Sequence, residues 1–227
     1  MNLASRRIRM VMGLRRAGVN DPRVLGVMEQ IERERFIPPA WQMDAYEDAP
    51  LPIGHGQTIS QPAVVGKMLQ ALEAGPRMRV LEIGVGSGYQ TAALAGLVRA
   101  VFGIERIKAL LSGAKLRLEE QKIDNVFLRW ADGGKGWPEG APFDRIIAAA
   151  AADDMPGALA DQLKPGGIMV LPLGVAGHQS LWRIRRDDTG FQTEDLGAVA
   201  FVPFLPGAIE ANLVAETPRC RPAQGAA

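Results

Sequence analysis

Apolar residues recur along this chain in two rhythms, which alternate through its middle. Short apolar runs typical of buried strands occupy residues 79–83, 101–105, 126–130, 143–149 and 167–172. Apolar positions at helical spacing predict intervening helices over residues 89–98, 107–121 and 155–163. Strands that alternate with helices in this way predict an α/β fold with a Rossmann-like, doubly wound and mostly parallel sheet.

The flanks of this alternating core carry other patterns. Helical spacing predicts three further helices on the N-terminal side, over about 4–18, 21–34 and 62–74. The stretch 48–61 is predicted to be irregular, because glycine and proline interrupt it. Beyond the core, strands at about 179–186 and 197–204, joined through turn residues 187–190, predict a C-terminal β-hairpin.

These elements fit one domain over residues 1–207, which is long enough to bury a full hydrophobic core. Within it we distinguish a helical N-terminal part (1–50), the predicted active-site segment with its helix (51–75) and the Rossmann-like core (76–207). Residues 208–227 are rich in Ala, Pro, Gly and charged residues, a composition that predicts a disordered tail.

The balance of charged residues limits the kinds of partner that the protein can attract. Lys and Arg number 26 against 25 Asp and Glu, so no global field recruits nucleic acid or an anionic membrane. Five arginines crowd the first sixteen residues, where they predict the basic, solvated face of an amphipathic helix rather than an RNA-binding arm. No stretch is long and apolar enough to span a membrane, and a single cysteine, Cys220, excludes an internal disulfide framework. We predict a cytoplasmic monomer without a metal ion.

The strongest chemical signal is Arg79–Gln90, an apolar strand that breaks into three alternating glycines before a helix. Gly84, Gly86 and Gly88 let the backbone pass close to a ligand, with a helix N-terminus behind them. A dinucleotide-binding loop would need glycine at the position of Tyr89, and a phosphate-binding loop would need a Gly-Lys-Ser/Thr ending. The loop therefore favours S-adenosylmethionine, which carries amino and ribosyl groups but no pyrophosphate.

Acidic residues follow the next two strands at the same predicted edge of the sheet. Glu105 ends the second strand about twenty residues beyond the first glycine, where a carboxylate can accept both ribose hydroxyls. Asp132 follows the third strand and can bond the adenine amino group. Singly, Glu105 is typical of a solvated strand end and Asp132 of a turn; their order and spacing favour a pocket for a cationic sulfonium. The predicted cofactor-binding residues are Glu82, Gly84, Gly86, Ser87, Gly88, Glu105, Asp132 and Gly133.

A second motif, Leu51–Pro62, precedes the glycine loop. In its residues and in its distance from that loop, the chain resembles the protein-L-isoaspartate O-methyltransferase family. The resemblance runs from about Val24 to Pro206 and includes Arg33–Phe36, Val170–Gly174 and Phe201–Pro203. The string Pro-Ile-Gly-x-Gly-Gln-Thr-Ile-Ser-x-Pro is specific to that family, whereas the glycine loop marks any class I methyltransferase. The resemblance implies a class I methyltransferase fold and S-adenosylmethionine-dependent methylation of L-isoaspartyl carboxylates in damaged proteins, which starts their repair.

The resemblance further implies that Ser60 is the active-site residue and that isoaspartyl proteins or peptides are the partners. An isoaspartyl carboxylate is already ionised at neutral pH, so the reaction needs alignment and exclusion of water rather than a general base. The Ser60 hydroxyl can orient such a carboxylate; alternatively, Ser60 caps the helix that opens at Gln61. The predicted acceptor-binding residues are Ile53, His55, Thr58, Ile59 and Ala150.

Three features depart from the family pattern. Ala131 stands where the family usually has glycine, Asp153 and Asp154 stand where it tends to have proline, and the tail with Cys220 is extra. Carboxylates close to the path of the acceptor would repel a carboxylate substrate. Two alternatives therefore stay open: a related O-methyltransferase for a different carboxylate, on a specialised peptide or small molecule, and a non-catalytic cofactor-binding interaction module.

Overall fold

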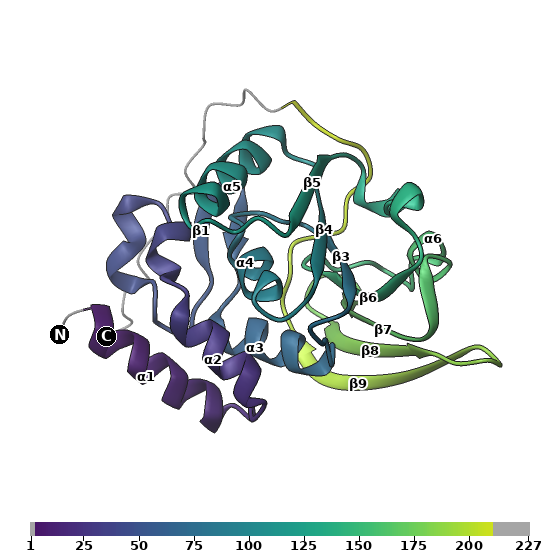
Figure 1. Ribbon diagram of the computed structural model, residues 1–227, viewed down its shortest axis with the longest axis horizontal. Helices are drawn as coiled ribbons and strands as arrows, with labels where there is room; N and C mark the ends of the chain where they lie inside the picture. The colour runs from purple at the N-terminus through teal and green to yellow at the C-terminus, as the bar shows by residue number, and fades with distance from the viewer. Residues whose placement is uncertain (1–2, 211–227) are drawn as a thin grey trace, which may run out of the picture.

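The computed structural model describes residues 3–210, which are organised around a seven-stranded sheet of order β5-β4-β3-β6-β7-β8-β9 (Figure 1). Five neighbouring strands are parallel: β3 (Arg79–Ile83), β4 (Ala100–Glu105), β5 (Val126–Trp130), β6 (Phe143–Ala148) and β7 (Leu163–Leu173). Two antiparallel strands extend the sheet beyond β7: β8 (Gln179–Arg186) and β9 (Phe191–Val199). The mostly parallel α/β fold and the C-terminal hairpin are confirmed.

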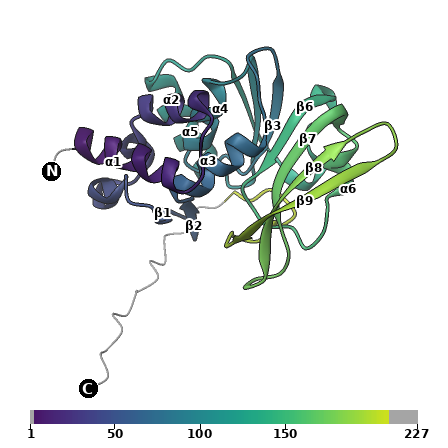
Figure 2. The same cartoon turned by 90° about the horizontal axis from the view of Figure 1, so that it is seen from below.

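The helices cover the two faces of this sheet unequally, as Figure 2 shows. One face carries α1 (Leu3–Arg16), α2 (Pro22–Gln30), α3 (Pro62–Ala71), α4 (Tyr89–Ala95) and α5 (Lys108–Glu120). The other carries the four-residue α6 (Gly157–Ala160). Four 3-10 turns complete the helical elements of the described chain: η1 (Arg33–Phe36), η2 (Pro39–Asp44), η3 (Gly133–Lys135) and η4 (Pro138–Gly140). Successive strand residues alternate between two hydrophobic cores, with Val80 in the first and Leu81 in the second.

The stretch predicted to be irregular contains a short antiparallel hairpin, β1 (Leu51–Gly54) and β2 (Gln57–Ile59). Its two turn residues, His55 and Gly56, have φ angles of 54° and 68°. Two successive positive φ angles are the mark of a type I′ turn, whose twist matches that of paired strands. The glycines interpreted as breaking regular structure therefore build it.

The predicted position of the last strand, 197–204, is wrong, since β9 spans Phe191–Val199. The Asp187 carboxylate accepts hydrogen bonds from the N–H groups of Thr189 and Gly190, so the turn closes early and the strand starts at once. The polar sequence of β9 hid it, because an edge strand with both faces towards solvent lacks an apolar alternation.

Residues 200–210, here called the crossing segment, leave β9 and run across the carboxyl ends of the parallel strands (Figure 1). Ala151 donates its N–H to Val202 O at 2.8 Å, and Ile209 pairs with Ile107 further along. Residues 208–210, the first of the predicted tail, thus contact the body of the protein. The rest of that tail, 211–227 with Cys220, lies outside the described residues.

Candidate active site

A cavity of about 190 Å³ lies beyond the carboxyl ends of β3 and β6, where the strand order reverses direction. Open α/β sheets bind ligands at such switch points, because the loops of the two diverging strands part there. Most of its lining residues come from four stretches: 53–60 with the β1–β2 hairpin, 83–90 with the glycine loop, 104–110 after β4, and 202–205 of the crossing segment. Single contributions come from Val65, Gly133, Ala149 and Ala150.

Gly84 and Gly86 present bare backbone to the cavity. Their φ angles of 85° and 56° belong to the left-handed region, which favours glycine. A Cβ on Gly86 would lie 3.3 Å from Ile53 Cδ1, so the hairpin and the glycine loop face each other across a narrow space. Gly88 does not line the cavity; it is the N-cap of α4 and packs against Ala114 of α5. Its glycine serves close helix packing.

Glu105 lines the cavity from the end of β4 and is almost fully buried. Its carboxylate accepts hydrogen bonds from the N–H groups of Gly86 and Ile107, both at 2.8 Å. Burial raises the pKa of Glu105, and the backbone donors oppose that rise. Each carboxylate oxygen keeps a further lone pair, so Glu105 can still accept hydroxyl donors from the cavity.

Two predicted cofactor residues, Glu82 and Asp132, do not line the cavity. Glu82 is fully buried and accepts hydrogen bonds from Thr91 Oγ1 at 2.6 Å and Gln90 Nε2 at 3.1 Å. Burial raises its pKa to about 7. Asp132 accepts from the Gly207 N–H at 2.9 Å and so fastens the crossing segment. Both carboxylates bond to donors of the protein rather than facing the cavity, and their spacing in the sequence does not indicate this.

Ser60 stands on the wall shared by this cavity and a second one of about 380 Å³. The second cavity is lined by Pro50, Thr58, Ser60, Gln61, Val64, Ala149 and residues 198–202. Within the described residues, the Ser60 hydroxyl has no hydrogen-bond partner. A hydroxyl in this place is free to bind a group that enters from either side.

The alternative role for Ser60, the cap of the following helix, is wrong. The N-cap of α3 is Gln61, and its side chain makes no capping bond. The Ala63 N–H, in the first turn of α3, instead donates to Asp48 Oδ1 at 2.8 Å. The capping hydrogen bond that this alternative expects of the Ser60 hydroxyl is therefore made by the Asp48 carboxylate, fifteen residues before Ala63 in the chain.

The other predicted acceptor residues divide into two groups. Ile53, Thr58, Ile59 and Ala150 line the first cavity, and Thr58 also faces the second. His55 occupies the hairpin turn and lines neither. Sequence reasoning missed the crossing segment as a cavity wall, formed by Val202, Pro203, Phe204 and Leu205. The signal that pointed to it was the family-like string Phe201–Pro203.

The described residues that depart from the family pattern cause no backbone strain and line neither cavity. Ala131 is absent from the described residues with positive φ, and its N–H donates to Glu105 O at 3.2 Å, so its methyl group strains no backbone. Asp153 and Asp154 are exposed and line neither cavity. Solvent and salt screen exposed charges, which limits the repulsion expected from these two carboxylates.

A glycine loop after the first parallel strand, a buried carboxylate after the second and a cavity at the switch point define a class I methyltransferase. The family model for protein-L-isoaspartate(D-aspartate) O-methyltransferase matches residues 5–208. This chain belongs to that family, as the motif at Leu51–Pro62 predicted.

Individual relatives are similar in sequence to this chain over most of its length. The protein-L-isoaspartate O-methyltransferase of Paramagnetospirillum magneticum is 54% identical over 202 residues, or 88% of this chain and 94% of the relative. That of Rhodospirillum centenum is 50% identical over 221 residues, covering 96% and 98%. A solved Plasmodium falciparum structure, described as a putative member in complex with S-adenosyl-L-homocysteine, is 27% identical, with a TM-score of 0.75, and covers 87% of this chain and 97% of that one.

Proposed function

We propose that this chain methylates the side-chain carboxylate of L-isoaspartyl residues in damaged proteins and peptides, with S-adenosylmethionine as methyl donor. The observation that carries the proposal is the place of Ser60, on the wall shared by two cavities. One cavity has the glycine loop and Glu105 of a nucleoside-cofactor site, and the other is open to an acceptor. Membership of the family, with relatives of this name at 50 to 54% identity, supports the same activity.

The residues present fit the cofactor. Gly84 and Gly86 form a cradle that a side chain would fill, and Glu105 offers carboxylate oxygens to hydroxyl donors. These three residues would hold it, and Phe204 of the crossing segment lines the same cavity. When bound, S-adenosylmethionine supplies a methyl group activated by its sulfonium charge.

The chain's own residues then have to orient and desolvate the acceptor. The carboxylate is ionised at neutral pH, so no proton has to be removed. Ser60 donates its hydroxyl hydrogen to one carboxylate oxygen and leaves the other free to attack. Ile53 and Ile59 line the same space and exclude water that would solvate the nucleophile.

The test is transfer of labelled methyl to an isoaspartyl peptide beside its normal aspartyl twin. Base-labile label on the isoaspartyl peptide alone is the expected result. If neither peptide is labelled although S-adenosylhomocysteine binds, the acceptor is a different carboxylate or the chain is a binding module. Label on a single dedicated peptide or small molecule would identify the specialised O-methyltransferase.

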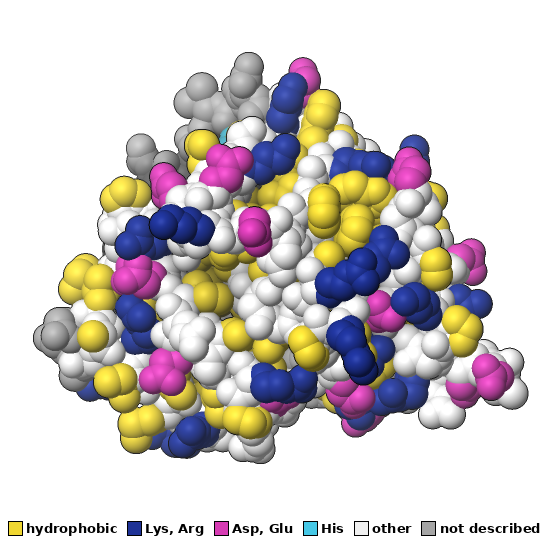
Figure 3. Space-filling view, in the orientation of Figure 1, with side chains coloured by type: hydrophobic (Ala, Val, Ile, Leu, Met, Phe, Trp, Pro, Cys, Tyr) yellow, Lys and Arg dark blue, Asp and Glu magenta, His cyan; other side chains and the backbone are white. Residues whose placement is uncertain are grey.

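We further propose that the protein acts as a cytoplasmic monomer and does not bind nucleic acid. On the face seen in Figure 3, Lys and Arg side chains are interspersed with Asp and Glu, which supports a surface without a phosphate-binding field. No helix within residues 3–210 is long and apolar enough to cross a membrane. Light scattering for mass tests the monomer, and a salt-dependent RNA retention assay tests the absence of nucleic-acid binding.

A further inference from the structure

Arg33, the first residue of η1, is a fully buried guanidinium behind the candidate site. Its Nε donates to the Ala45 carbonyl at 2.7 Å and its Nη2 donates to the Ser60 carbonyl at 2.8 Å. The guanidinium carbon also lies 4.6 Å from the centroid of the Tyr89 ring. Tyr89 starts α4 directly after the glycine loop and lines the first cavity. One side chain therefore connects the acceptor side of the site to the cofactor side.

No carboxylate of the described residues forms an ion pair with this charge, although the Asp48 carboxylate is close enough to favour it electrostatically. None of the ion pairs formed among residues 3–210 includes Arg33. Arg33 Nη1 and the Tyr89 hydroxyl are both buried, and neither has a hydrogen-bond partner among residues 3–210. Burial lowers the pKa of Arg33 and raises that of Tyr89, and the two groups oppose each other's shifts. A buried, unpaired charge is destabilising, so its presence calls for a role beyond packing.

We propose that Arg33 is a positioning residue for methyl transfer, which fixes the Ser60 carbonyl against the Tyr89 ring and so sets the spacing between acceptor and cofactor loops. Arg33 lines neither cavity, so it acts through these two neighbours and does not touch the reactants. Methyl transfer is sensitive to this spacing, because a misplacement of about 1 Å costs on the order of a hundredfold in rate. The inference rests on the proposed function.

The chemistry of the guanidinium suits this task. Its planar fork can donate to carbonyls on two separate segments while its face stacks on an aromatic ring. A lysine ammonium at the same place keeps the charge but has no planar face and a shorter reach. Arg33→Lys therefore separates the geometry from the charge.

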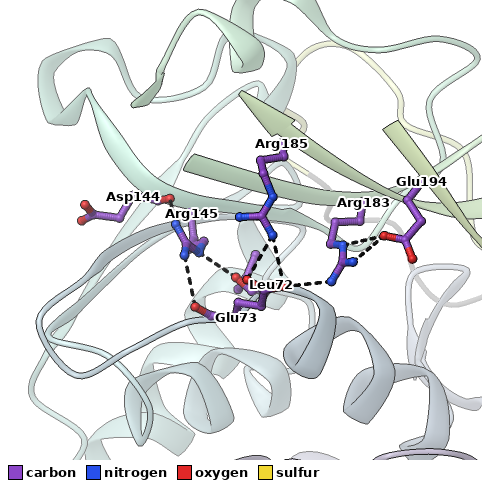
Figure 4. A network of polar contacts seen from close by, with 7 residues as sticks. All are labelled: Leu72, Glu73, Asp144, Arg145, Arg183, Arg185 and Glu194. Carbon is purple, nitrogen blue, oxygen red and sulfur yellow. Dashed lines mark hydrogen bonds and ion pairs between the residues drawn. The ribbon is translucent and has the colours of Figure 1, made fainter. Parts of the chain in front are cut away.

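The chain offers a matched control in Arg145, which is also buried and donates to three backbone carbonyls where Arg33 donates to two. Figure 4 shows it beside Leu72, Glu73 and Asp144, in a network that includes Arg183 and Arg185. Arg145 lies near the amino end of β6, away from the cavities. Arg145→Lys tests what the loss of a buried guanidinium does to stability alone.

The experiment compares Arg33→Lys, Arg145→Lys and the unmodified protein well below their melting temperatures. Both variants are expected to melt earlier. Arg33→Lys should lose about tenfold or more in kcat on an isoaspartyl peptide at saturating substrates, with S-adenosylhomocysteine affinity within about threefold. Arg145→Lys should keep its kcat within about twofold.

A kcat for Arg33→Lys within about twofold of the unmodified protein overturns the inference, as does an equal loss in Arg145→Lys. If Arg33→Lys does not fold, Tyr89→Leu removes the ring while both carbonyl bonds stay. Its kcat should fall about threefold or more at saturating cofactor, and an unchanged kcat is again contrary. An unmodified protein that binds S-adenosylhomocysteine but labels no isoaspartyl peptide would instead refute the proposed function, and this inference with it.

Discussion

The two walls of the first cavity are held together in different ways. The glycine-loop wall is one short stretch, 83–90, held by its own turn and by the adjacent strand β4: Gly88 N–H donates to Val85 O at 2.9 Å and Gly84 N–H to Ile104 O at 2.8 Å. The acceptor wall gathers stretches around Ser60 and Val202 that are far apart in the chain. Each is fastened by a residue from elsewhere, as Arg33 fastens the Ser60 carbonyl.

This difference separates two kinds of perturbation. A change in the glycine loop alters the surface that faces the cofactor, because the backbone itself is that surface. A change on the acceptor wall loosens a segment that remains in place through its other contacts. We therefore expect cofactor binding to depend on the first wall and methyl transfer to an acceptor on the second.

The largest effect is expected from Gly86→Val. A side chain there meets a positive φ of 56° and lies within 3.3 Å of Ile53, in the space that opens to the cofactor. Calorimetry should show S-adenosylhomocysteine affinity reduced by about a hundredfold or more. Gly177→Val is the control, since Gly177 also has a positive φ but nothing within 4 Å of its Cβ position. Cofactor affinity within about tenfold of normal in Gly86→Val would refute the assigned cradle.

Ser60→Ala is expected to have the next largest effect, and on a different quantity. Loss of a hydrogen bond to a charged carboxylate should lower kcat/KM for the isoaspartyl peptide by about ten- to a hundredfold. S-adenosylhomocysteine affinity should stay within about twofold, because Gly84, Gly86 and Glu105, rather than Ser60, are the residues proposed to hold the cofactor.

Asp48→Ala supplies the contrast for that variant. It removes the actual cap of α3 and should cost about 1 kcal/mol of stability, while Ser60→Ala leaves the melting temperature nearly unchanged. Full activity in Ser60→Ala would show that the hydroxyl has no part in the reaction.

The sequence predicted what depends on near neighbours in the chain. Five parallel strands, their alternating helices and the glycines at 84 and 86 follow from local periodicity and spacing. The family match then located Ser60, whose role its immediate neighbours left ambiguous between catalysis and a cap. The cap belonged to Asp48, and no local pattern connects residue 48 to the helix that starts at residue 62.

The rest could not be predicted because it depends on where chain segments meet. The crossing segment reaches the cavity only because β9 ends at Val199 and the chain then turns across the strand ends. Asp132 has the spacing of an adenine ligand, yet its carboxylate bonds to Gly207, which lies 75 residues further along the chain. The nearest donor in space determines which way a strand-end carboxylate points, and the spacing of residues in the sequence does not indicate which donor that is.

A smaller effect is expected from Gln179→Leu. The buried Gln179 amide accepts from Phe201 N–H at 2.6 Å and donates to Phe201 O at 3.2 Å, which fixes the 198–202 wall of the second cavity. Its loss should raise KM for the isoaspartyl peptide about three- to tenfold, with a smaller change in kcat.

Gln162→Leu is the matched control for this prediction. Gln162 makes the same kind of clamp on the backbone of Lys135, Trp137 and Ala158, and it lines neither cavity. A rise in KM in both variants would mean that general loosening, rather than the acceptor wall, is responsible.

The smallest effect on activity is expected from Glu82→Gln, which acts on stability instead. Burial raises the Glu82 pKa from 4.5 to about 7 in the folded protein, so the folded state binds more protons than the unfolded state between those values. Stability contributed by this group is therefore greatest below about pH 4.5 and falls as the pH rises to about 7, by about 3 kcal/mol at full effect. Glutamine has no such titration, and its carbonyl can still accept from Thr91. The melting temperature of Glu82→Gln relative to the unmodified protein should rise from about pH 5 to about pH 7 and level off above that; parallel curves from about pH 5 to about pH 7 would mean that Glu82 titrates normally.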